Sequence, residues 1–152
     1  MWFTKRARAK SVAKAQALLG EGNIHGYAFG ETGPNPTYTM WALVGGAVLI
    51  FAMTFAIFRV GIIVGGLIVF AIRYYVNPPC SIAVADRGVA LLKRGFWNMH
   101  PTELVAKLPH DITNNVVQDS GSRVQIDLGV ERVWVTKKEF AHLQPVAGAS
   151  RF

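Results

Sequence analysis

The chain has 152 residues, with 16 Lys and Arg against 9 Asp and Glu, which gives a formal charge of +7. Its single cysteine, Cys80, excludes an intramolecular disulfide. The basic excess lies in the first 22 residues, whereas residues 80–152 are nearly balanced, which argues against a nucleic-acid-binding stripe on the folded domain. The four histidines are scattered without metal-ligand spacing, so neither a metal site nor a cofactor is expected.

Residues 1–22 are predicted to form a basic amphipathic N-terminal segment, with a helix over 4–19 that ends at Gly20. Such a helix is typical of a membrane interface, and a partly disordered positive tail is the alternative interpretation. The predicted lipid-headgroup set joins four residues of this segment with two later ones: Lys5, Arg6, Arg8, Lys10, Lys93 and Arg94.

Residues 23–38 are predicted to hold a first strand, over 23–30, and a loop. Gly26 and Gly30 disfavour a helix there, and Pro34 and Pro36 exclude one from the loop.

Residues 39–76 are predicted to form a transmembrane hairpin. The run from Trp41 to Ile72 contains a single charge, Arg59. As one straight helix it would span about 48 Å, against a hydrocarbon core of about 30 Å, so two helices with a turn near Arg59 are favoured. Basic residues flank both ends, which places both termini in the cytoplasm and the protein in the cell membrane as a multi-pass chain.

Residues 77–152 are predicted to be rich in strands. Runs with alternating apolar residues are separated by turn signals at 80–85, 89–95, 102–109, 111–120, 121–129 and 131–137, and a helical spacing follows over 138–143. The alternation at Val124, Ile126 and Leu128 predicts that these three side chains face one core, with Gln125 turned outward.

No catalytic constellation is present in the sequence. It lacks a phosphate-binding glycine loop, a G-x-S-x-G elbow and paired carboxylates, so no catalytic residue and no enzyme activity is expected. Asp86 and Arg87 are interpreted as turn residues of a tight hairpin.

The segment SIAVADRGVALLKRG (81–95) is similar to a hairpin of bacterial pleckstrin-homology-like (PH-like) domains. The stretch GETGPNP (30–36) before the apolar run resembles small actinobacterial membrane proteins in which a transmembrane hairpin interrupts such a domain. The resemblance implies an α+β membrane protein, with a two-helix transmembrane hairpin and a PH-like seven-stranded β-barrel that ends in a C-terminal helix. Gly88 departs from the pattern, since a basic residue is common at that position.

The expected function is that of a non-enzymatic, membrane-anchored scaffold or accessory subunit, whose partners are other membrane proteins in a larger complex. Phe96, Trp97 and Met99 form the predicted partner-binding loop, because aromatic residues and Met are enriched at interfaces. The alternative is a module that senses or tethers anionic lipids. A small channel of associated hairpins and an enzyme are the remaining hypotheses.

Overall fold

The computed structural model describes residues 5–20, 23–53, 58–95, 100–109 and 116–143, with the side chains of 49–64 left out. These residues form two compact units. The first joins the N-terminal part up to Thr32 with the part from Pro79 onward, and the second spans Gly33–Pro78. The second unit is therefore inserted into the first along the chain, directly after its first strand.

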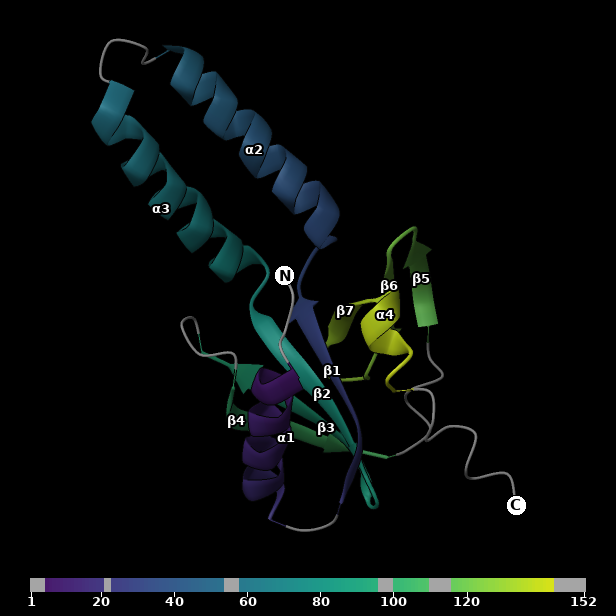
Figure 1. Ribbon diagram of the computed structural model, residues 1–152. Coiled ribbons are helices and arrows are strands. Elements are labelled where there is room, and N and C mark those ends of the chain that lie inside the picture. The colour runs from purple at the N-terminus through teal and green to yellow at the C-terminus, as the bar shows by residue number, and fades with distance from the viewer. Residues whose placement is uncertain (1–4, 21–22, 54–57, 96–99, 110–115, 144–152) are drawn as a thin grey trace. The chain divides into compact units, whose positions relative to one another are not determined.

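The first unit contains, in its described residues, one antiparallel sheet of seven strands in the order β4-β3-β2-β1-β7-β6-β5 (Figure 1). The strands are β1 (Ile24–Thr32), β2 (Pro79–Ala85), β3 (Gly88–Arg94), β4 (Pro101–Leu108), β5 (Val116–Ser120), β6 (Arg123–Asp127) and β7 (Arg132–Thr136). β1 pairs with β2 on one side and with β7 on the other, so the sheet joins segments from both sides of the insertion.

Short turns connect β2 to β3, β5 to β6 and β6 to β7. Asp86 and Arg87 connect β2 to β3, where Gly88 has φ of +143° and the position of a Cβ would fall 2.2 Å from the Leu108 carbonyl oxygen. Only glycine fits at that point, because a side chain would collide with the backbone of β4. The departure from the basic residue of the PH-like pattern is thus explained by the close approach of β4.

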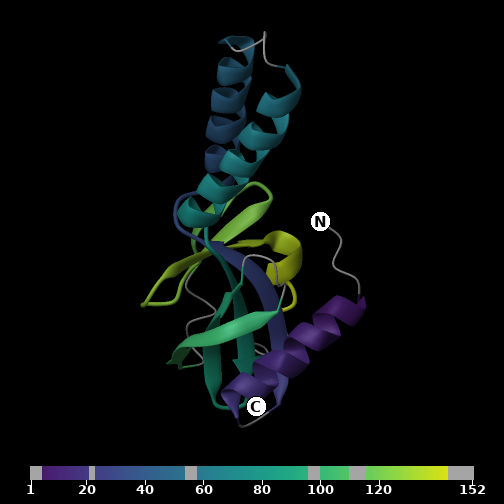
Figure 2. The same cartoon turned by 90° about the vertical axis from the view of Figure 1, so that its left-hand side faces the viewer.

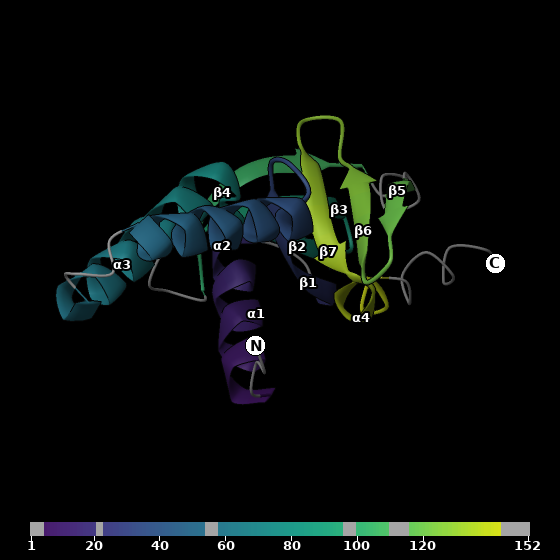
Figure 3. The same ribbon diagram turned by 90° about the horizontal axis from the view of Figure 1, so that it is seen from above.

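The core of the first unit lies between the two halves of the sheet. Figure 3 shows β5, β6 and β7 turned across the other strands. Apolar side chains from β1–β3, among them Ile82 and Leu91, pack with Val124, Ile126 and Leu128 from the other half. The predicted inward direction of these three residues is confirmed. Gln125, predicted to face away from this core, is not part of it, but it is buried rather than exposed.

A second layer covers the outer face of β1, β2 and β3. Helix α1 (Lys5–Leu19) buries Ala15 and Leu19 against Tyr27, Phe29 and their neighbours on the sheet (Figure 1). The helix was predicted to be an interfacial arm or a loose tail, but small and apolar residues at i, i+4 and i+8 give it a narrow face that fits the sheet.

Helix α4 (Lys137–Phe140) follows β7, and three more described residues come after it. The Thr136 hydroxyl accepts a hydrogen bond from the Glu139 backbone N–H and so caps the helix at its start. The next residues reach Gly26 on β1, where a Cβ would fall 2.9 Å from the His142 carbonyl oxygen.

The second unit is a helical hairpin formed by α2 (Pro36–Met53) and α3 (Phe58–Val76), which lie side by side (Figure 2). Its open end is closed by polar contacts. The Asn77 side chain donates a 2.7 Å hydrogen bond to the Pro34 carbonyl oxygen, and Gly33 approaches the Val76 carbonyl so closely that only glycine fits.

The predicted transmembrane hairpin was wrong. In the part of the chain that the structure describes, no helix is both long and apolar enough to cross a membrane. With 18 and 19 residues, α2 and α3 would extend only about 27 and 28 Å, against a core of about 30 Å. Polar Thr37 and Thr39 occupy the first turn of α2, and α3 contains Arg59 and Arg73. The predicted multi-pass cell-membrane location with cytoplasmic termini was wrong for the same reason.

The predicted β-barrel was also wrong. The α+β class and seven strands at the expected places agree with the structure, but the sheet is open, because its end strands β4 and β5 are not paired with each other in the described residues. The predicted C-terminal helix over 138–143 is short, at four residues.

Candidate functional site

Exposed apolar side chains gather on the helical hairpin. Tyr38 and Trp41 on α2 are 71% and 70% exposed, and Tyr75 on α3 is 86% exposed. The other large apolar residues that are exposed among the described side chains of this unit are Met40, Val44, Val48, Leu67, Ile68, Phe70, Ile72 and Val76. We call these eleven residues the hairpin surface. Monomeric soluble proteins rarely expose large apolar patches, and such patches mark interaction sites.

The hairpin surface follows from the composition of the two helices. Nearly every position of α2 after Thr39 and of α3 outside its arginines is apolar or glycine, so each helix is apolar around its whole circumference. Two antiparallel helices cover each other along one seam only, which leaves the other sides uncovered. At Gly45, Gly46, Gly65 and Gly66, no atom of the described residues lies within 4 Å of where a Cβ would stand, so another backbone could approach closely there.

A second, polar cluster lies between α1 and the sheet. The Arg8 guanidinium pairs with the Glu139 carboxylate at 2.5 Å and donates a 3.1 Å hydrogen bond to the Tyr27 carbonyl oxygen. The same Glu139 oxygen accepts a hydrogen bond from the Phe29 backbone N–H at 3.1 Å. One turn further along α1, Ser11 Oγ lies 3.0 Å from His100 Nδ1.

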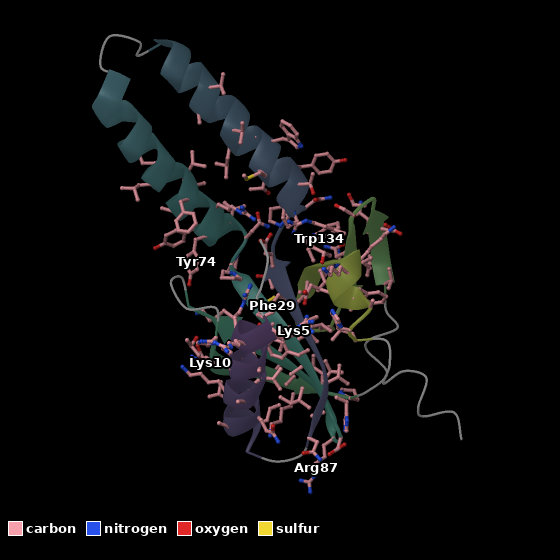
Figure 4. The ribbon with its side chains drawn as sticks, in the orientation of Figure 1. Lys5, Lys10, Phe29, Tyr74, Arg87 and Trp134 are labelled. Atoms are coloured by element: carbon pink, nitrogen blue, oxygen red, sulfur yellow. The ribbon has the colours of Figure 1, made fainter. Side chains whose placement is uncertain are left out.

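Two arginines lie against one aromatic ring in this cluster. The guanidinium carbon of Arg94 is 4.8 Å from the centre of the Phe29 ring, and that of Arg8 is 5.8 Å away. The Tyr27 ring packs edge-on against Phe29 at 5.2 Å. Figure 4 shows Phe29 beside the N-terminal half of α1. These distances are those of cation–π contacts.

The predicted lipid-headgroup residues are not brought together as one surface. Lys5, Arg6 and Lys10 are exposed on α1, and Lys93 is exposed on β3. Figure 4 labels Lys5 and Lys10 on the helix. Arg8 and Arg94 instead point into the cluster between helix and sheet. Headgroup binding by these residues stays a prediction.

The predicted partner-binding loop, with Phe96, Trp97 and Met99, lies outside the described residues, so its role also stays a prediction. Within the described ranges, no three His, Cys, Asp or Glu side chains gather as a metal site.

The cluster also includes Ser81, which is buried and whose hydroxyl lies close to the Tyr27 hydroxyl. Sequence reasoning missed Tyr27, Ser81 and Glu139 as its members. Ser81 carries a weak signal, since it is a polar residue in the otherwise apolar strand β2. Nothing in the sequence links Arg8 to Glu139, because the two are 131 residues apart.

Comparison of the chain with protein-family models, with curated proteins and with solved structures found no match. The resemblance to PH-like domains therefore rests on the sequence patterns alone.

Proposed function

We propose that this chain is a non-enzymatic scaffold or accessory protein that binds other proteins through the hairpin surface. The observation that carries the proposal is the group of exposed aromatic and aliphatic side chains on α2 and α3. Tyr and Trp are enriched among the residues that dominate binding energy, which favours Tyr38 and Trp41 as anchors.

Each large apolar side chain that passes from water into an interface contributes about 1.5–3 kcal/mol. A partner helix laid along the hairpin would cover several of them at once, in the manner of a helix bound in an apolar groove.

The test is quantitative co-purification with the full chain. We expect a partner protein to be recovered in a fixed molar ratio with the wild type, and that ratio to fall at least tenfold with Trp41→Lys, because Lys would bring a charge into the interface. Val130→Lys is the matched control, since Val130 is an exposed valine of the sheet unit. Equal recovery with both variants contradicts the proposal.

A further inference from the structure

Arg94 is a buried cation with few partners. It is 9% exposed, and its one hydrogen bond in the described residues is a long one, 3.5 Å from its guanidinium to the Gly30 carbonyl oxygen. Its Nε has no hydrogen-bond partner in the part of the chain that the structure describes. A guanidinium has five N–H donors, so most of the hydrogen-bonding capacity of Arg94 is unused among these residues.

Other donors near Arg94 are also unsatisfied. The Tyr27 hydroxyl, the Ser81 hydroxyl and Arg8 Nε are buried, and none makes a hydrogen bond of good geometry with the described part of the chain. Burial raises the pKa of Tyr27, while the nearby Ser81 hydroxyl and the Arg94 charge act in the opposite direction. The phenol is therefore neutral at pH 7 and keeps its proton as a donor.

The carboxylates closest to this group are committed elsewhere. Glu139 accepts from Arg8 and from the Phe29 backbone, and Glu31 pairs with Arg123 at 3.1 Å. No ion pair between Arg94 and a carboxylate is present in the described residues. Buried donors of Arg94, Tyr27 and Ser81 thus lack an acceptor among the described residues, and leaving a buried polar group without a partner is costly.

We propose that Arg94, Tyr27 and Ser81 form a binding site for a small oxyanion of the phosphate or carboxylate class, with Arg8 at its rim. The planar fork of arginine matches both anions with two parallel hydrogen bonds. The Phe29 ring holds the Arg94 guanidinium in place from one side. Arg8, with its side chain 27% exposed, is the member of the group nearest to solvent.

The test uses the full chain, with sodium phosphate and sodium acetate as probes and sodium chloride at equal ionic strength as the reference. Calorimetric titration and the melting temperature are the readouts. We expect saturable binding and a rise in melting temperature with at least one probe, and the stronger probe identifies the class. Arg94→Gln should weaken that binding about tenfold or more, because it removes charge-assisted hydrogen bonds. Lys93→Gln is the control on the adjacent, exposed residue and should bind like the wild type.

Tyr27→Phe keeps the test decisive if Arg94→Gln does not fold. In chloride this variant should melt at or above the wild-type temperature, because it removes an unsatisfied buried hydroxyl, whereas its affinity for the anion should fall several-fold. Saturable binding that is weakened in Tyr27→Phe and unchanged in Lys93→Gln supports the site. Absence of saturable binding of both probes, or equal binding by all variants, overturns it.

Discussion

Arg8 on α1 and Glu139 on α4 form an ion pair at 2.5 Å, although 131 residues separate them in the chain. The pair joins the first described helix to the last one, and Glu139 also accepts from the backbone of β1. The Glu139 carboxylate therefore connects three elements: α1, α4 and β1.

Replacing Arg8 by Met should lower the free energy of unfolding by about 1.5–3 kcal/mol, because Glu139 would lose its charged partner in a part-buried position. Urea denaturation followed by circular dichroism measures this change. Arg6→Met, on the exposed side of the same helix, should stay within about 0.5 kcal/mol of the wild type. Equal effects of both substitutions would show that the pair does not hold α1 in place.

The second prediction concerns the pairing of β1 with β7 at Gly30, and its effect on stability. A Cβ there would fall 2.5 Å from Val133 Cγ1 and 3.1 Å from the Trp134 carbonyl oxygen. We expect Gly30→Ala to destabilise the protein by about 1–3 kcal/mol through overpacking. Gly46→Ala, in α2 with open space around it, should instead stabilise the hairpin by up to about 1 kcal/mol. Thermal melts of the two variants should shift in opposite directions, and a neutral Gly30→Ala would contradict the β1–β7 register.

Cys80 is buried in β2, and burial raises the pKa of its thiol to about 12. At pH 8 only about 10⁻⁴ of it would be thiolate, the reactive form. We expect alkylation of the native protein by iodoacetamide to proceed no faster than unfolding, and to become rapid in denaturant. Because the folded-state pKa is raised, the thiol's contribution to stability is present below about pH 9 and is lost as the pH rises toward 12. Fast alkylation at pH 8 without denaturant would disprove the placement of Cys80.

Local patterns were sufficient to predict the strands. The alternation at Val124, Ile126 and Leu128 and the Asp86–Gly88 turn are encoded in neighbouring residues, and the structure has both. The same local view could not predict that Gln125 is buried, since its burial depends on what covers the outer face of the sheet. The apolar content of residues 39–76 predicted the two helices correctly. It did not predict their surroundings, because hydropathy alone does not distinguish a helix covered by lipid from one covered by protein.

The polar cluster was beyond sequence reasoning for a different reason. Arg94 and Lys93 are adjacent and both basic, so both belong to the predicted lipid-headgroup set. Alternation along β3 turns them to opposite faces of the sheet, which leaves Lys93 in solvent and Arg94 under α1.

Site-specific photo-crosslinking tests the central claim, the binding of a protein partner by the hairpin surface, most directly. A photoreactive amino acid would replace Trp41, Val48 or Leu67 on the hairpin, and Gln16 on the exposed side of α1 as the control. Irradiation of living cells that produce these full-length variants should yield one protein adduct of defined mass from the hairpin positions and none from position 16. Equal labelling at all four positions, or no protein adduct from the hairpin, would contradict the account.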